Sequence, residues 1–231
     1  MKTLLRTALI TLAAVATIGA TKPAPRAAAP AAAKGNWVAT VVRTPANSIL
    51  VGNPNAPAKL AEYFSYTCPH CAHFEKEAAG ELTIGFIRTG KGSMEYRPFL
   101  RNIVDVAATL MATCGSPAKF PGNHAMLMRG QEKWLVQISE AQMKRWGAGT
   151  FAQRMQAIAS DFKFYDMFAT RGYDRLTLDK CLANQPLAES WSKENQAAKE
   201  VEGTPTFYLN GRKQYVNTWE GLRPILMDAT R

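Results

Sequence analysis

Two cysteines separated by a proline and a histidine, Cys68-Pro69-His70-Cys71, constrain this chain more than any other feature of its sequence. The preceding segment 59–66 (KLAEYFSY) is rich in aromatic residues and predicts a buried strand, whereas the following AHFEKEAAGEL predicts a helix. Pro69 then falls in the first helical turn, a position that tolerates proline. The pattern therefore predicts a strand, a short turn and a helix, with the first cysteine at the helix N-terminus.

A cysteine in that position has altered acid–base chemistry. Its sulfur lies near unpaired backbone N–H groups and the positive end of the helix dipole, and both stabilise the thiolate over the thiol. We therefore expect a lowered pKa for Cys68, to which His70 can add a positive charge or a hydrogen bond. Such a thiolate is a good leaving group, so its disulfide is oxidising. Cys71 is then the resolving cysteine, one helical turn further along.

Three other uses of a C-x-x-C pair compete with this interpretation. A zinc site needs a second pair of ligands, but Cys114 and Cys181 each stand alone, and recruiting His73 or His124 gives none of the usual spacings. Haem attachment requires a histidine directly after the second cysteine, where this chain has Ala72. An inert structural disulfide is the third alternative, although a proline-containing pair that opens a helix is unusual for one. We therefore expect neither a metal nor an organic cofactor.

The N-terminal segment 1–20 predicts export. Lys2 and Arg6 precede an uncharged apolar run, 7–20, which is too short to span a bilayer comfortably and ends in small residues. We interpret 1–20 as a secretory signal, and an uncleaved membrane anchor is the alternative. Residues 21–35 (TKPAPRAAAPAAAKG) predict an extended linker. Export would place the cysteines in an oxidising compartment, where they are paired or redox-active.

Composition excludes several other classes of protein. The chain has 231 residues, of which 47% are hydrophobic and 20% charged, so it is neither disordered nor collagen-like. Its four cysteines are too few for a disulfide-dense mini-scaffold. The formal net charge is +10, but it is +5 without the basic residues of 1–35, and the remaining charges are scattered. We therefore do not expect nucleic-acid binding.

The remaining pattern alternates between strands and helices. Further strands are expected at 36–43 and 93–100, a loop at 48–58, and mainly helices from 103 to about 198, with a break at 121–123. Segments 205–210 and 213–216 predict a hairpin around Asn210-Gly211, followed by a helix at 219–228. This order predicts an α/β fold with a helical block inserted between its two halves.

A second motif, Gly203-Thr204-Pro205-Thr206-Phe207, precedes the hairpin. Together with EYFSYTCPHCAHF it makes residues 36–231 resemble the thioredoxin superfamily, and within it the DsbA-like thiol–disulfide oxidoreductases of bacteria. The resemblance implies a thioredoxin-like fold with an inserted helical domain. On this basis we expect the thioredoxin part at 36–102 and 199–231, and the insertion at 103–198.

The resemblance also implies roles for individual residues. Pro205 would be a cis-proline packed against the active-site disulfide, and Thr204 would face that disulfide, where its hydroxyl can hydrogen-bond a thiolate. Glu62 matches an acid beneath the active site that accepts or relays the Cys71 proton. Taken without the cysteine motif, Pro205 fits better as an ordinary turn proline at a strand start, and Glu62 could equally be exposed at a strand edge.

The other two cysteines, Cys114 and Cys181, both fall in the helical block. Some DsbA-like proteins of α-proteobacteria carry a second, structural disulfide in this domain, so the resemblance supports a bond between them. The alternative is two separate buried thiols that behave as small hydrophobic residues.

These observations predict a periplasmic thiol–disulfide oxidoreductase that introduces disulfide bonds into reduced, unfolded secreted proteins through a mixed disulfide with Cys68. The resemblance implies re-oxidation by a DsbB-like membrane partner coupled to quinone. We expect a monomer, because only a short linker replaces the N-terminal dimerisation domain typical of isomerases of this fold. A disulfide isomerase or reductase remains an alternative, as does a non-catalytic peptide-binding module or holdase.

Overall fold

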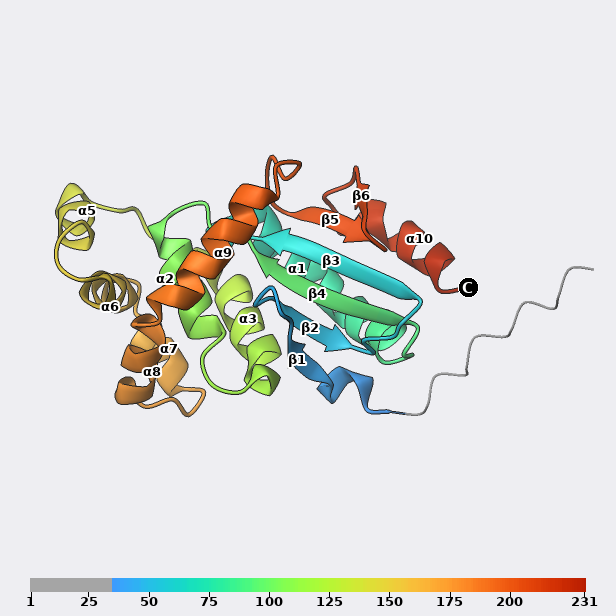
Figure 1. Cartoon of the computed structure of the whole chain (residues 1–231), viewed down its shortest axis with the longest axis horizontal. Helices are drawn as coiled ribbons and strands as arrows, with labels where there is room; N and C mark the ends of the chain where they lie inside the picture. The colour runs from blue at the N-terminus through green and yellow to red at the C-terminus, as the bar shows by residue number, and fades with distance from the viewer. Residues whose placement is uncertain (1–34) are drawn as a thin grey trace, which may run out of the picture. The chain divides into compact units, whose positions relative to one another are not determined.

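The computed structural model describes residues 35–231, which contain a six-stranded mixed sheet with the strand order β1-β2-β4-β3-β5-β6 (Figure 1). Strands β3 and β4 are parallel, and every other pair of neighbours is antiparallel. The strands are β1 (Val41–Arg43), β2 (Ile49–Gly52), β3 (Ala58–Phe64), β4 (Gly92–Pro98), β5 (Thr206–Leu209) and β6 (Arg212–Gln214). The predicted signal 1–20 and most of the predicted linker lie outside the described residues.

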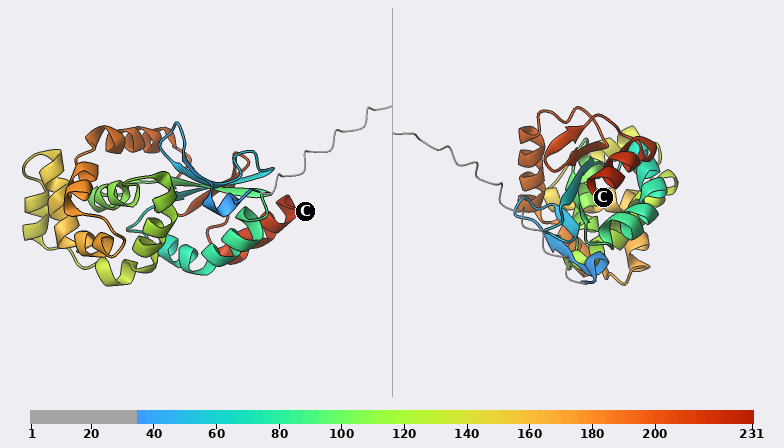
Figure 2. Two further views of the ribbon diagram at one scale, coloured as in Figure 1. Left: turned by 90° about the horizontal axis from the view of Figure 1, so that it is seen from below. Right: turned by 90° about the vertical axis from the view of Figure 1, so that its right-hand side faces the viewer.

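Two helices cover one face of the sheet, and one of them begins inside the cysteine motif. Helix α1 (Pro69–Glu81) follows β3 and continues into a π-helical segment, Leu82–Ile87. Together with the C-terminal helix α10 (Trp219–Ala229) it covers one face of the sheet (Figure 2). Phe74 of α1 joins these layers, because its ring lies 4.6 Å from that of Phe207 in β5 and 6.3 Å from that of Trp219.

The remaining α-helices lie between β4 and β5 in the sequence and form a block beyond the end of the sheet where β3 ends (Figure 1). They are α2 (Ile103–Ala112), α3 (Phe120–Arg129), α4 (Gln131–Trp134), α5 (Glu140–Trp146), α6 (Phe151–Asp161), α7 (Phe164–Ala169), α8 (Arg175–Leu182) and α9 (Gln185–Ala197). Short 3₁₀ turns occur at Trp37–Ala39 and Pro117–Lys119. The expected fold class, a thioredoxin-like fold with an inserted helical domain, is confirmed.

Aromatic side chains form the core of this helical block. Trp134, Phe162 and Phe164 are buried, with ring centroids 5.0–5.7 Å apart. Trp146 and Phe168 are also buried. These buried aromatic residues form the core of the insertion. Among the described residues, no helix has both the length and the apolar character needed to cross a membrane.

Three sequence-based expectations about local structure are wrong in whole or in part. Of the strand expected at 36–43 only Val41–Arg43 forms, because Trp37–Ala39 is a 3₁₀ turn. The segment 48–58, expected to be a loop, begins with β2, because Ile49 and Val51 are buried and pair with Tyr96 and Met94 of β4. The expected break at 121–123 lies inside α3, because Pro121 takes a position in the first turn, where no helical N–H is lost. His124 is consequently on a helix and not in a loop.

Candidate active site

The buried carboxylate of Asp105 hydrogen-bonds to the turn between β3 and α1. Asp105, on α2 and 1% exposed, accepts hydrogen bonds from the backbone N–H of Thr67 and the hydroxyl of Ser65, both at 2.9 Å. It also accepts one from the backbone N–H of Arg101 at 2.9 Å. Because a buried carboxylate needs several donors to remain charged, this arrangement fixes the turn that leads into Cys68.

A second polar side chain from the insertion supports the same turn. The buried amide of Gln131, at the start of α4, donates to the carbonyl oxygens of Tyr66 at 2.7 Å and Cys68 at 2.9 Å. Neither Gln131 nor Asp105 was identified from the sequence. Asp105 carried a weak signal as an acid in the first turn of a predicted helix, whereas nothing in the sequence pairs Gln131 with a turn so far away.

Cys68 is the N-cap of α1, in extended conformation, and Pro69 occupies the first helical turn. The preceding strand and the helix thus meet as the sequence predicted. Cys68 and Cys71 are not bonded to each other here, and both are buried, at 3% and 1% exposure. The hydrogen bonds around the pair are therefore those of its reduced form.

The second motif lies directly against Cys68. The Thr204–Pro205 peptide bond is cis, and the thiol of Cys68 donates to the Thr204 carbonyl oxygen at 3.0 Å. The hydroxyl oxygen of Thr204 is buried and hydrogen-bonds to no other oxygen or nitrogen of the described chain. It is therefore a donor available to the sulfur of Cys68. The expected placement of Pro205 and Thr204 beside the cysteine pair agrees with this geometry.

Hydrogen bonds donated to the sulfur lower the pKa of Cys68 from 9.0 to about 4. The largest cause is a hydrogen bond from the Cys71 thiol, which outweighs the opposing effect of burial, and the Thr204 side chain adds another. The backbone N–H groups of Cys71 and His70, at the helix N-terminus, stabilise the thiolate further. Cys68 is therefore a thiolate at neutral pH in the reduced protein.

Cys71 and Glu62 behave in the opposite way. Burial raises the pKa of Cys71 well above 9.0, and its hydrogen bond to Cys68 and the charge of Glu62 raise it further. Burial also raises the pKa of Glu62 well above its usual value, reinforced by the charges of Glu75 and Cys68. Glu62 is 2% exposed, so the alternative of an exposed strand-edge residue is wrong. A buried acid with a raised pKa thus lies near the pair, where it can exchange a proton with Cys71.

His70 differs from the expectation for its side chain. The residue is exposed, and its imidazole forms no hydrogen bond to Cys68 within the described part of the chain. Its contribution to the thiolate comes from the backbone N–H. His73, also exposed, lies 3.2 Å from Glu77 on the same helix and takes no part in the site.

A buried polar cluster under α1 was not predicted from the sequence. Glu75, 8% exposed, accepts two hydrogen bonds from Arg129, at 3.0 and 3.2 Å. Burial nevertheless raises the pKa of Glu75. His124 Nδ1 lies 3.0 Å from the Tyr66 hydroxyl, and burial, assisted by the charge of Arg129, lowers the pKa of His124 to about 3. His124 is thus a neutral, hydrogen-bonded core residue next to the turn that carries Cys68.

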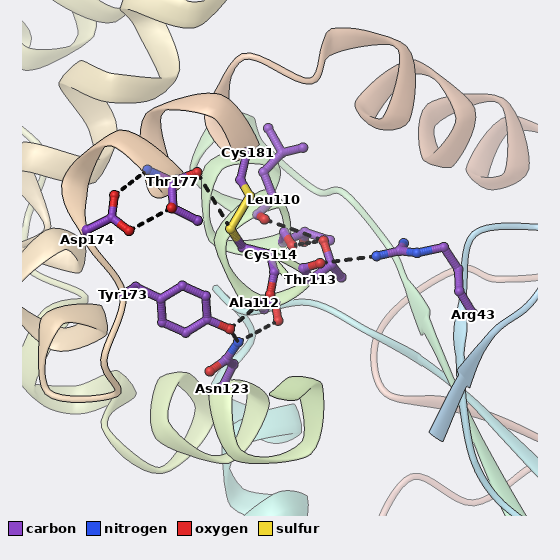
Figure 3. The surroundings of a disulfide bond; sticks show 11 residues. Arg43, Leu110, Ala112, Thr113, Cys114, Asn123, Tyr173, Asp174, Thr177 and Cys181 are labelled. Carbon is purple, nitrogen blue, oxygen red and sulfur yellow. Dashed lines mark hydrogen bonds between the residues drawn. A yellow bond between two sulfur atoms is a disulfide. The ribbon is translucent and has the colours of Figure 1, made fainter. Parts of the chain in front are cut away.

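The remaining cysteines form a disulfide in the insertion, Cys114–Cys181, with a Cα–Cα distance of 5.6 Å (Figure 3). It joins the residues after α2 to α8. Tyr173 donates to the Cys114 carbonyl oxygen at 2.9 Å, and Arg43 of β1 donates to the neighbouring Thr113 carbonyl oxygen at 3.1 Å.

The donor set does not fit a metal site. Within residues 35–231, no cluster of three or more His, Cys, Asp or Glu side chains could hold a metal ion. The zinc alternative raised by the C-x-x-C pair therefore finds no second pair of ligands in the part of the chain that is described.

Comparison with known proteins defines the class. A family model described as Thioredoxin matches residues 44–228, so the chain belongs to the thioredoxin family. The crystal structure of Wolbachia pipientis α-DsbA1 superimposes with a TM-score of 0.65 at 16% identity, over 80% of this chain and 91% of that one, so the two share a fold. The chain is therefore a member of the thioredoxin family that shares the fold of this structure, with the helical insertion.

Particular relatives extend this result. A protein-disulfide isomerase from Novosphingobium aromaticivorans, known from a crystal structure, is 45% identical over 79% of this chain and 97% of that chain, with a TM-score of 0.74. A putative protein-disulfide oxidoreductase of Rickettsia bellii is 26% identical over 169 residues, covering 71% of this chain and 58% of that protein. The chain thus spans little more than half the length of the curated relatives it matches.

Proposed function

We propose that this protein is an exported thiol–disulfide oxidoreductase that acts chiefly as an oxidase of reduced, unfolded secreted proteins. The observation that carries the proposal is the stabilised thiolate of Cys68, with a pKa of about 4. A pair whose reduced form is stabilised in this way gives up its disulfide readily. The predicted signal 1–20 supports a periplasmic location, and the names of the Novosphingobium and Rickettsia relatives support disulfide chemistry.

The reaction proceeds in two exchanges. A substrate thiolate attacks the sulfur of Cys68 in the Cys68–Cys71 disulfide, forms a mixed disulfide and releases Cys71 as a thiolate. Because the pKa of Cys71 is high, that thiolate takes up a proton, and Glu62, whose own pKa is raised by burial, is the nearby buried group suited to exchange it. A second substrate thiolate then attacks the substrate sulfur, and Cys68 leaves as the stabilised thiolate. The substrate is oxidised by two electrons and the enzyme is reduced by two.

Each turnover leaves a reduced pair that must be re-oxidised. The DsbA-like fold supports a membrane partner of the DsbB type, coupled to quinone, as the oxidant. No step of the exchange needs a metal or an organic cofactor, because both reacting sulfur atoms are supplied by protein thiols.

The reduction potential of the Cys68–Cys71 pair tests the proposal directly. We expect equilibration with glutathione to give a value near the oxidising end of the family range, about −120 mV. A value near −270 mV, typical of thioredoxin, would identify a reductase instead. The Cys114→Ala, Cys181→Ala variant is the matched control, because only the active-site pair then contributes to the measurement.

Isomerase activity is the second candidate, because the Novosphingobium relative is called a protein-disulfide isomerase. Thr204 is compatible with it, since a hydroxyl beside the thiolate adjusts the stability of the reduced pair. Recovery of a scrambled multi-disulfide protein, with no added oxidant, separates the two functions. An oxidase oxidises reduced substrate quickly but reshuffles scrambled substrate poorly, whereas an isomerase does the reverse.

A further inference from the structure

An open apolar cavity of about 510 Å³ lies in the helical insertion, at the end of α4. Buried Trp134 and Phe162 line it, together with Met126 and Met167, which are partly exposed. Methionine side chains adapt their shape to different apolar partners, and they are common on surfaces that bind many sequences. The cavity is therefore suited to apolar side chains of more than one shape.

The rim of the cavity is positively charged. Lys133 and Lys163 both line it and are exposed, and neither has a carboxylate partner among residues 35–231. The one acid in the lining, Asp161, is already engaged by Arg145 at 2.6 Å and by the indole N–H of Trp146 at 2.7 Å. Two free ammonium groups beside apolar walls favour an occupant that carries a carboxylate next to an apolar group.

Two neighbouring residues at the start of α4 contact the cavity and the active-site turn. Gly130 lines the cavity, and the next residue, Gln131, donates to the Cys68 carbonyl oxygen at 2.9 Å. Beyond α4 the chain is not helical and exposes further apolar surface, with Val136 52% and Ile138 36% exposed. The cavity and this apolar surface therefore lie along the same segment of the insertion as Gln131, which supports the turn that carries Cys68.

Another apolar cavity, of about 300 Å³, lacks both features. It lies between the end of α1 and α10 and includes Ile84 and Met227. Glu81 and Arg223, which also line it, neutralise each other in an ion pair of 2.6 Å. Since Cys68 caps the opposite end of α1, this cavity offers neither free charge nor proximity to the reacting sulfur.

We propose that the insertion cavity is a substrate-binding subsite: it takes an apolar side chain of the reduced polypeptide, and Lys133 and Lys163 bind an acidic residue beside it. The inference rests on the proposed function and names the segments that the enzyme oxidises best. Cysteines followed or preceded by an apolar–acidic pair are preferred over cysteines in neutral or basic surroundings.

Oxidation rates of matched peptides test the subsite. The substrates are reduced two-cysteine peptides that contain Leu-Glu, Leu-Lys or Ser-Ser at a fixed distance from the cysteine, and dithiothreitol is the small dithiol. With Lys133→Glu combined with Val136→Asp, we expect KM for the Leu-Glu peptide to rise about tenfold with kcat unchanged. Oxidation of dithiothreitol and of the Ser-Ser peptide should not change.

Matched substitutions elsewhere control for charge and exposure. Lys193→Glu on α9 and Ile84→Asp in the other cavity change comparable exposed side chains and should leave KM for the Leu-Glu peptide unaltered. Equal KM values for all peptides in the wild type, or equal effects of test and control variants, overturn the subsite. If the wild-type protein failed to oxidise dithiothreitol, that result would instead contradict the proposed function itself.

Covalent mapping gives an independent answer. A peptide carries a photoreactive leucine analogue and one cysteine activated as a disulfide with thionitrobenzoate. Cys68 of the Cys71→Ser variant attacks the peptide sulfur and releases thionitrobenzoate, and the resulting mixed disulfide is then irradiated. Cross-links to Met126 or Met167 support the subsite, whereas cross-links to Ile84 or Met227 overturn it. Binding of a fluorescent fatty acid in the cavity that the peptide fails to displace would also overturn the subsite, in favour of an anionic amphiphile.

Discussion

The two cysteine pairs of this protein lie in different environments, one directly after the interior strand β3 and one in the helical insertion. Cys68 and Cys71 lie at a helix N-terminus, against a proline in cis and above a buried acid. Cys114 and Cys181, 67 positions apart in the sequence, form a disulfide between the residues after α2 and α8, where Tyr173 donates to the Cys114 carbonyl oxygen. The same residue type thus becomes reactive where donors stabilise its thiolate, and structural where none do.

The first prediction removes the reactive thiolate. Cys68→Ser should reduce disulfide transfer to dithiols by about a thousandfold or more, because no other sulfur in the site is a thiolate at neutral pH. Oxidation of dithiothreitol measures the loss. Cys114→Ala, Cys181→Ala is the control and should keep most of the rate. If both variants lost activity equally, the division of roles between the two pairs would be wrong.

The second prediction removes the structural bond. Replacing both Cys114 and Cys181 with alanine should lower the free energy of unfolding by about 4 kcal/mol, because the bond closes a long loop in the unfolded chain. Urea unfolding under oxidising conditions measures the difference. Wild-type protein with this bond reduced should resemble the variant. Equal stability of variant and oxidised wild type would show that the bond contributes nothing to folding.

The third prediction breaks the connection between the two regions. Asp105→Ala leaves the donors of Ser65, Thr67 and Arg101 without an acceptor and should destabilise the protein by about 3 kcal/mol. Asp105→Asn keeps an acceptor oxygen and should be milder. Urea unfolding ranks the three proteins, and an unchanged stability of Asp105→Ala would mean that the turn is held by other contacts.

The fourth prediction concerns how the free energy of unfolding depends on pH when the Cys68–Cys71 pair is reduced or oxidised. The pKa of Cys68 falls from 9.0 to about 4 on folding of the reduced protein. Its contribution to stability is complete above the unfolded pKa and is lost as the pH falls through about 4. The oxidised protein lacks this titration, so the stability of reduced relative to oxidised protein should rise with pH across that window.

Unfolding of both forms at several pH values measures this effect. Cys68→Ser serves as the reduced-state control, since it should lack the dependence contributed by Cys68. A difference between reduced and oxidised protein that stays constant with pH would contradict a lowered pKa.

The smallest expected effect comes from one hydroxyl. Thr204→Val removes the side-chain donor to the Cys68 thiolate and should raise the pKa of Cys68, making the pair less oxidising. Ultraviolet absorbance of the thiolate against pH measures the shift. Thr206→Val is the matched control, because its hydroxyl donates to the Gly203 carbonyl oxygen and not to sulfur. Identical titrations of Thr204→Val and wild type would exclude this role.

Local sequence determined the strand–turn–helix unit around Cys68, because apolar spacing and the position of Pro69 act over a few residues. The hairpin at Asn210-Gly211 was predictable for the same reason, since both residues have the positive φ that this turn requires. The resemblance to DsbA-like proteins added the neighbourhood of Pro205 and Thr204 to the cysteine pair. It also named Glu62, which the residues alone left open between burial and exposure.

Only the tertiary structure decided which distant groups surround the sulfur atoms. Gln131 and Asp105 reach the cysteine turn from the insertion, and no local pattern encodes a contact across so many residues. The strand β2 was missed because its few residues become a strand only by pairing with β4. The pKa of Cys68 likewise depends on Thr204, which folding brings from the far end of the chain. Sequence thus set the reactive groups, and packing set their chemistry, because burial and hydrogen bonding exist only in the folded chain.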